Sequence, residues 1–198
     1  MLRKFAPLAT ALVCVALTSA CLLDPKEKPP GPDPVKPKGK FYDLTEIWHP
    51  LNNLEQAYSQ RNIERYAEAL DSVYYTFFFS PADYSSGKTD ESWTYDQDTG
   101  AANRMFDAQL PDISKRAVNL EFDLVFNPNS IVWSEVIPAD PPNETWHAAT
   151  FGYTFYIKLG DGVREFVQAP GASATITVRQ DPGSGKWRIV QIYDVPGL

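Results

Sequence analysis

The chain has 198 residues, of which 43% are hydrophobic and 13% aromatic, and it carries 18 Lys and Arg against 25 Asp and Glu. This length allows one domain with a sizeable core, and the hydrophobic content excludes a disordered chain. The net charge of -7 argues against nucleic-acid binding, because phosphates are neutralised by clustered basic side chains. Two cysteines are too few for a disulfide framework or a cysteine-rich zinc site.

Residues 1–20 have the pattern of a bacterial export signal, with Arg3 and Lys4 ahead of an uncharged apolar stretch. This stretch is shorter than the ~20 apolar residues that a membrane-spanning helix needs. Its end resembles a lipobox, in which the signal is cut before a cysteine that carries a diacylglycerol. We therefore expect a lipoprotein anchored in the membrane through Cys21. The alternative is an ordinary signal-peptidase cut after Ala20, since Leu lies one position earlier than a lipobox usually has it.

Residues 21–40 are expected to be the lipidated cysteine and a linker rich in Pro and Lys. Each proline fixes φ and removes a hydrogen-bond donor, so the linker favours an extended, semi-rigid spacer. Leu22, rather than Asp, follows the cysteine, which by the usual sorting rule favours the outer membrane, facing the periplasm or the cell surface. With Cys21 acylated the remaining domain has no free thiol, and its two histidines are too few for a three-His site. We expect no metal and no cofactor.

The remaining residues, 41–198, show helical periodicity first and strand alternation afterwards. Apolar residues recur at three- and four-residue spacing over 45–69, and Gln60-Arg61-Asn62 interrupts them, which predicts two helices or one bent helix. A third helix is expected over 95–110, ended by Pro111.

Alternating or aromatic-rich segments predict the strands 73–79, 116–126, 131–137, 145–159, 174–179 and 187–194. Gly160-Asp161-Gly162 is a hairpin signal. Helices gathered at the start and strands gathered at the end predict an α+β fold. In it, N-terminal helices pack on a strongly curved antiparallel β-sheet.

The order of these elements carries a resemblance to a known family. Residues 54–66 and Tyr75–Phe79, with the final strand Lys186–Asp194, resemble the nuclear transport factor 2-like superfamily, a cystatin-like α+β cone. Trp93 and the short helix ending at Phe106 are similar to a group of lipoproteins of unknown function within it. The resemblance implies a pocket between the sheet and the helices.

In the ketosteroid isomerases of that superfamily, a carboxylate in the pocket removes a proton next to a carbonyl, and a Tyr and a protonated acid stabilise the oxyanion. The positions of this chain that align with the oxyanion Tyr and the base are Leu54 and Phe78. Both are apolar, so neither role carries over. We therefore expect a ligand- or partner-binding domain that is not an enzyme, with a pocket acid–base enzyme of the isomerase or dehydratase type as the alternative.

The expected pocket residues are aromatic or titratable side chains on apolar faces: Tyr66, Tyr75, Trp93, Phe106, His147 and Tyr153. Aromatic side chains at strand spacing also suit an ordinary core. The carboxylates nearest apolar surroundings, each a candidate buried base, are Asp71, Asp107, Asp123 and Asp194. Residues 41–198 hold 11 basic and 22 acidic residues, a net charge of -11, which suits solubility or a cationic ligand. The expected partners are the membrane, a small apolar or cationic ligand, and a second copy of the chain.

Overall fold

The computed structural model describes residues 39–195, apart from residues 86, 88, 89, 161, 163, 164 and 168–170. The expected signal peptide, Cys21 and almost all of the linker lie outside the described residues. Those that are described belong to one compact unit, Lys38–Leu198. Across this described part of the chain, no helix combines the length and the apolar character that crossing a membrane requires.

The helices gather in the first half of the domain. They are α1 (His49–Gln60), α2 (Ile63–Ala69), the short α3 (Pro81–Tyr84) and α4 (Tyr95–Phe106), with a 3-10 turn η1 (Pro128–Ser130) further on. The predicted break between the first two helices is confirmed. Arg61 ends α1 in the left-handed conformation at φ 52°, and the Asn62 side chain then caps α2 by accepting from the Arg65 amide at 3.0 Å.

The third predicted helix is present but shorter than expected. Thr94 and Gln97 form a capping box at its start, which stabilises two of its first amide groups. Asp107 has an extended backbone, so α4 ends at Phe106, before Pro111 is reached.

The strands form one eight-stranded sheet within the described residues. They are β1 (Thr76–Phe78), β2 (Ser92–Thr94), β3 (Ala117–Val125), β4 (Ser134–Val136), β5 (Trp146–Leu159), β6 (Glu165–Val167), β7 (Ser173–Gln180) and β8 (Trp187–Val195). The order is β2-β1-β8-β7-β5-β3, and β4 and β6 pair with β5. The predicted α+β fold is correct, with one detail to correct: β1 pairs with β8 in parallel, and the other pairs are antiparallel.

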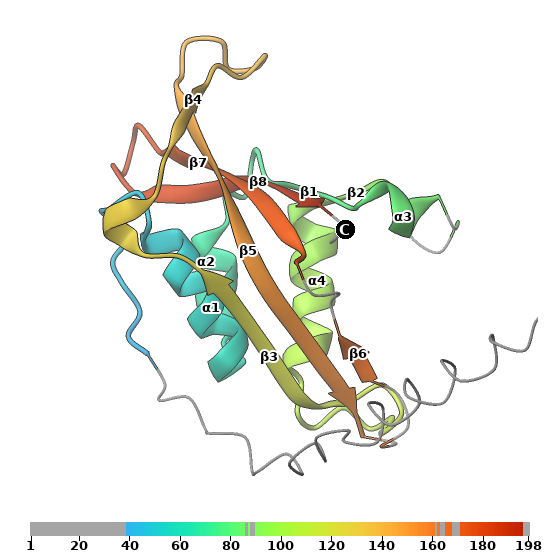
Figure 1. Ribbon diagram of the computed structural model, residues 1–198. Helices are drawn as coiled ribbons and strands as arrows, with labels where there is room; N and C mark the ends of the chain where they lie inside the picture. Colours follow the sequence, from blue (N-terminus) through green and yellow to red (C-terminus); the bar gives the residue numbers. More distant parts are fainter. Residues whose placement is uncertain are drawn as a thin grey trace, which may run out of the picture. The chain divides into compact units, whose positions relative to one another are not determined.

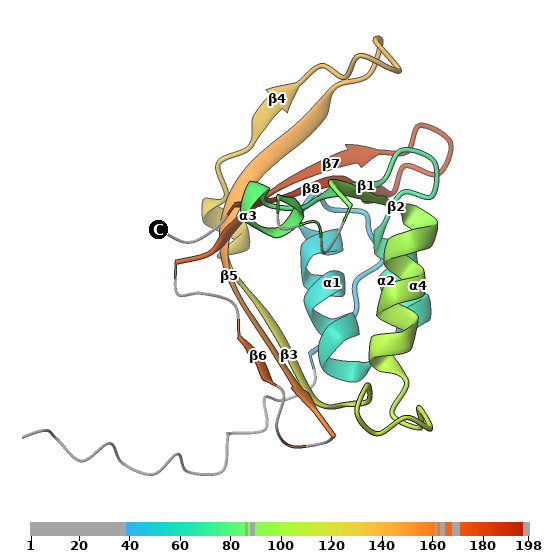
Figure 2. The same ribbon diagram turned by 90° about the vertical axis from the view of Figure 1, so that its right-hand side faces the viewer.

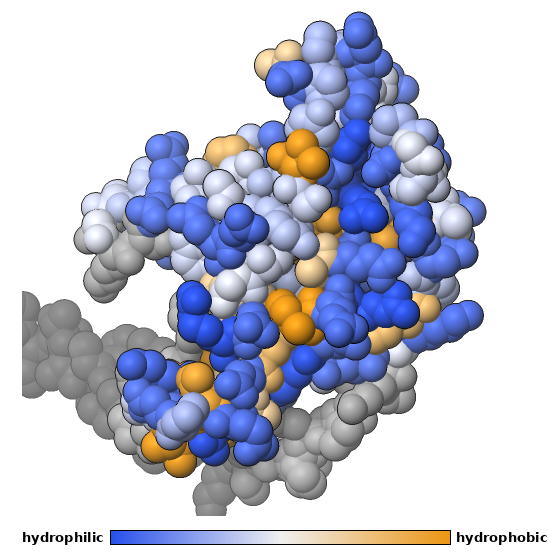
Figure 3. Space-filling view, turned by 180° about the vertical axis from the view of Figure 1, so that it is seen from behind, coloured by the Kyte–Doolittle hydropathy of each residue, from blue (hydrophilic) through white to orange (hydrophobic). Residues whose placement is uncertain are grey.

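The sheet curves around the helices, and α1, α2 and α4 lie on its inner side (Figures 1 and 2). Alternation along β5 directs Phe151 inward, where it is 4% exposed, and the neighbouring Thr150 outward. On the helix side, Leu51 and Leu54 of α1 are buried against the same core. Figure 3 views the molecule from this helix side, and the visible surface is mainly hydrophilic with scattered hydrophobic spots. The apolar faces of the helices therefore pack against the sheet.

A buried ion network joins the sheet to the segment that follows α2. Arg179 of β7 is 6% exposed and donates to Asp71 at 2.7 Å and to both carboxylate oxygens of Glu144 at 2.8 and 2.9 Å. Its guanidinium also lies 4.7 Å from the ring centroid of Tyr74. Asp71 in turn accepts from two backbone amides, those of residues 73 and 74. Asp71, one of the candidate bases, is therefore a structural counter-ion.

Replacing Arg179 with Met should lower the free energy of unfolding by about 3 kcal/mol, because it leaves two carboxylates in a mostly buried site without their cation. Urea denaturation of the purified protein measures this loss. The matched control is Arg65→Met, since Arg65 pairs with Glu68 at 2.6 Å but is 45% exposed. That change should cost less than about 1 kcal/mol. Equal losses in the two variants would contradict a special role for the network.

Candidate functional site

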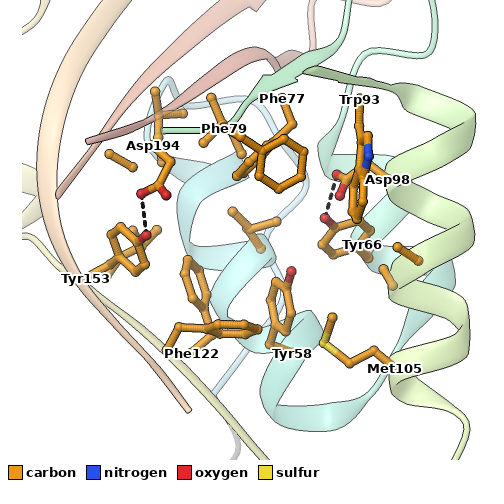
Figure 4. Close-up of a pocket in the computed structure, with 18 residues that line it drawn as sticks. Tyr58, Tyr66, Phe77, Phe79, Trp93, Asp98, Met105, Phe122, Tyr153 and Asp194 are labelled. Carbon is orange, nitrogen blue, oxygen red and sulfur yellow. Dashed lines mark hydrogen bonds between the residues drawn. The ribbon is translucent and has the colours of Figure 1, made fainter. Parts of the chain in front are cut away.

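A cavity of about 250 Å³ lies between the inner face of the sheet and the helices α1, α2 and α4 (Figure 4). The helices contribute Tyr58, Tyr66 and Met105 to its wall, and the strands contribute Phe77, Phe122 and Tyr153. The lining is almost wholly apolar apart from two carboxyl groups, those of Asp98 and Asp194. The cavity is thus a hydrophobic space with two acidic groups in its wall.

Edge-to-face contacts hold the aromatic wall in place. The ring centroid of Tyr58 lies 5.4 Å from that of Tyr66 and 5.2 Å from that of Phe106. The plane of the Tyr58 ring is nearly perpendicular to both of these rings. The Phe122 ring lies 4.9 Å from that of Tyr58. Aromatic pairs in edge-to-face or tilted geometry gain more than area burial alone, so these contacts stabilise the wall.

Asp98 lies in the first half of α4 and is 7% exposed. Its Oδ2 accepts the hydroxyl of Tyr66 at 2.8 Å and that of Tyr75 at 2.6 Å. Burial raises the pKa of Asp98, while the two hydroxyl hydrogen bonds act in the opposite direction. Burial also raises the pKa values of Tyr66 and Tyr75 well above 10, so both phenols keep their protons and remain donors.

Asp194 stands near the end of β8, on the other side of the cavity from Asp98 (Figure 4). Its Oδ1 accepts the Tyr153 hydroxyl from β5 at 2.5 Å. Burial raises the pKa of Asp194, the Tyr153 hydrogen bond lowers it, and the nearby Asp83 raises it through charge and a side-chain hydrogen bond. Asp83 belongs to α3 and is itself held by the Ser80 hydroxyl at 2.6 Å. An acid pair therefore borders the pocket at this end.

Half of the pocket residues named from the sequence line the cavity: Tyr66, Trp93 and Tyr153. Tyr75 lies outside the lining, where its hydroxyl holds Asp98. Phe106 is a core residue whose ring meets those of Tyr58 and Tyr66.

His147 lies away from the cavity, with its ring centroid 5.5 Å from that of Trp187. The reason is its position along β5. It sits at the start of the strand, paired with β4, beyond the part that the helices cover (Figure 1).

The structure places the four candidate bases in four different environments. Asp194 lines the cavity, Asp71 pairs with Arg179, Asp107 is exposed at the end of α4, and Asp123 lies on β3 between the inward-facing Phe122 and Leu124. Of the two aligned isomerase positions, Leu54 lines the cavity, whereas Phe78 is stacked on Tyr193 at 4.2 Å and is absent from the lining.

Asp98 was missed by the sequence reasoning, because acidic residues near a helix start are ordinary. The available signal was its helical spacing: Asp98 shares a face with Ala101, Ala102 and Met105, which makes it one acid in an apolar stripe.

Within the described residues, no group of three or more His, Cys, Asp or Glu side chains is arranged to hold a metal ion.

No family model and no curated protein matches the sequence. Solved structures do match the fold. The "putative aromatic ring hydroxylase" from Novosphingobium aromaticivorans is 10% identical, with 79% of this chain and 89% of that chain covered and a TM-score of 0.51. A type 2 hexachlorocyclohexane dehydrochlorinase (LinA) is 10% identical, with 75% and 81% covered and a TM-score of 0.50.

A nuclear transport factor 2-like superfamily protein from Salmonella enterica is 12% identical, with 78% of this chain and 91% of that chain covered and a TM-score of 0.48. At such low identity, structural likeness concerns the fold alone. The domain shares its α+β fold with the first two of these structures, and the predicted packing of N-terminal helices on a curved, mostly antiparallel sheet is confirmed.

Two substitutions should move the pKa of Asp194 in opposite directions. Tyr153→Phe removes a hydrogen bond to the carboxylate, so the pKa should rise further. Asp83→Asn removes a neighbouring negative charge, so the pKa should fall. A ¹³C NMR titration of the Asp194 carboxyl measures both. The exposed Asp112 should titrate alike in all three proteins, and shifts of equal sign at Asp194 would contradict the arrangement.

Proposed function

We propose that the domain binds a small, mainly apolar ligand in the cavity beneath its sheet, and that it does so without being an enzyme. The observation that carries this proposal is the aromatic cavity of about 250 Å³ with two carboxyl groups in its wall. Drug-sized ligands occupy pockets of about 300–1,000 Å³, and an engineered cavity of about 150 Å³ holds benzene. The size therefore favours a compact ligand of one ring with a few substituents.

The location that we propose is the cell envelope. Support comes from the export-signal pattern of residues 1–20, from the lipobox-like sequence before Cys21, and from the proline-rich linker that follows. A diacylglycerol on Cys21 would hold the domain at the outer membrane, facing the periplasm or the cell surface. The linker gives the domain reach, so the pocket can meet ligands in the aqueous space beside the membrane.

Native mass spectrometry of the full chain, extracted from bacterial membranes, tests both parts of this proposal. The protein should lack residues 1–20, carry a diacylglycerol on Cys21, and include a population bound to a small molecule. Ala101→Phe places a ring in the cavity, because Ala101 of α4 is part of its lining. That variant should lose the bound molecule and keep the lipid.

Two control variants separate the lipid anchor from the binding of the ligand. Asn103→Phe adds the same ring on the exposed side of α4 and should retain both lipid and ligand. Cys21→Ser should lack the lipid and the cut that depends on it, and should keep the ligand. An unmodified Cys21 in the wild-type protein contradicts the anchor. Ligand that persists in Ala101→Phe, or that is absent from the wild type, contradicts binding in this cavity.

A second candidate function is acid–base catalysis of the isomerase or dehydratase type. The observation that favours it is Asp194, a carboxyl group with a raised pKa in an apolar pocket, hydrogen-bonded by Tyr153. Such a carboxylate suits removal of a proton from a carbon next to a carbonyl. Asp98, whose pKa is also raised, would in its protonated form donate to the resulting enolate oxygen.

Cyclohex-3-enone is a substrate small enough to test this second function. Removal of the proton between its carbonyl and double bond, and return of a proton at the far alkene carbon, gives cyclohex-2-enone, which is followed by ultraviolet absorbance. An enzyme should exceed the buffer rate and lose about 100-fold in Asp194→Asn, whereas the exposed Asp112→Asn should change nothing. A wild-type rate equal to that of buffer contradicts catalysis of this type.

A further inference from the structure

The charge in the cavity wall has one sign. Asp98 and Asp194 are its ionisable acids, and the lining contains no Lys, Arg or His in the part of the chain that the structure describes. The described residues give these two carboxyl groups no basic partner. Their hydrogen bonds come from the phenols of Tyr66, Tyr75 and Tyr153, and Asp194 also has one with Asp83. Phenol hydrogen bonds stabilise a carboxylate but do not neutralise it.

This arrangement differs from that of another buried acid, Asp71. Asp71 is 4% exposed, and its charge is balanced by the guanidinium of Arg179 at 2.7 Å. The chain thus supplies a cation where a buried carboxylate has a structural role. At the cavity, the described residues supply no cation to Asp98 or Asp194. The ligand can therefore supply that cation.

The rest of the wall suits an organic cation as well. Aromatic rings from helices and strands surround the same space, among them Tyr58, Phe79, Trp93 and Phe122 (Figure 4). The ring centroids of Phe79 and Trp93 lie 4.8 Å apart, and the angle between the ring planes is 81°. The two rings therefore present differently oriented surfaces to the same part of the cavity. The faces of aromatic rings attract cations, and quaternary ammonium groups in particular are recognised by several rings at once.

Asp194 is the better placed counter-ion of the two. Asp98 is almost fully buried, and one of its oxygens already accepts two hydroxyl groups. Asp194 is only partly buried and lies beside Asp83, a second acid whose charge acts on it. A cation bound here would be attracted by both acids, and an anion would be repelled by both.

We propose that the ligand is a compact organic ammonium ion, whose apolar body fills the cavity and whose charge lies between Asp194 and the aromatic wall. This inference rests on the proposed binding function and names the class of ligand for the same cavity. The negative charge of the domain assists it, because a net charge of -11 over residues 41–198 draws cations toward the protein.

The test uses two probes of the same shape, phenyltrimethylammonium and its uncharged counterpart tert-butylbenzene, with the full chain and isothermal titration calorimetry. The cation should bind at least about tenfold more tightly, which is the range of a desolvated cation–aromatic contact plus a counter-ion. In Asp194→Asn the ratio of the two affinities should shrink to about twofold. Asp112→Asn, at an exposed acid, should keep the full difference.

A pH series gives a measurement that does not depend on how well a variant folds. The groups that face Asp194 are Tyr153 of β5 and Asp83 of α3, and Asp194 must be ionised to attract a cation. Its raised pKa means that the affinity for phenyltrimethylammonium should increase as the pH rises through that value. The affinity for tert-butylbenzene should stay flat over the same range.

The outcomes separate the two proposals. Binding of tert-butylbenzene as tight as that of the cation overturns the ammonium inference and leaves the binding cavity standing. Tight binding of the cation that survives Asp194→Asn and shows no pH dependence also overturns it. If neither probe binds, the proposed binding function fails together with the inference.

Discussion

The inner face of β5 sets a constraint on the whole domain. This strand has 14 residues and extends for about 46 Å at the usual rise, whereas α1, with 12 residues, is about 18 Å long. A flat sheet would leave most of that apolar face in water. The sheet curves around the helices instead, and the aromatic side chains of β3 and β5 close over the space that the helices do not fill. The cavity is what remains of that space.

Polar atoms inside such a cavity must find partners, because an unpaired buried polar group is costly. Among the described residues, the partners of the cavity's two carboxyl groups are tyrosines and not basic side chains. Tyr66, Tyr75 and Tyr153 keep the apolar character of the wall and place a hydroxyl on each carboxylate. Arg179 shows that the same fold can accommodate a buried guanidinium. The absence of a basic group from the described lining is therefore a property of this site rather than of the fold.

How much of this could be predicted from the sequence depends on the length of each signal. The break at Arg61 and the alternation along β3 and β5 extend over many residues, so two helices and the main strands were predicted correctly. The strands β2 and β6 have three residues each, too few for a period to show. The parallel pairing of β1 with β8 was missed for the same reason, since no local pattern in three residues encodes a distant partner.

The site was predictable in kind but not in position. Alternation indicates which face of a strand is buried, yet it cannot indicate where along β5 the helices stop covering it. Tyr153 and His147 share one predicted face, and only Tyr153 reaches the cavity. Asp194 was among the predicted candidate bases because its neighbours in the sequence are apolar. Asp98 was missed because acidic residues are common near the start of a helix. A helical projection nevertheless places Asp98 on the same face as alanines.

The two candidate functions require different charge states of the same carboxyl group. Recognition of an ammonium ion needs Asp194 ionised, and the bound charge would itself lower the pKa of that group. Proton transfer needs a pKa close to the working pH, which burial and Asp83 favour as long as no cation is present. Asp83 is therefore central to both, because its charge raises the pKa of an empty site and adds to the attraction for a cation in an occupied one. Catalysis on a neutral ligand and binding of a cation are thus alternatives at this site, separated by whether Asp194 meets a carbonyl compound or a positive charge.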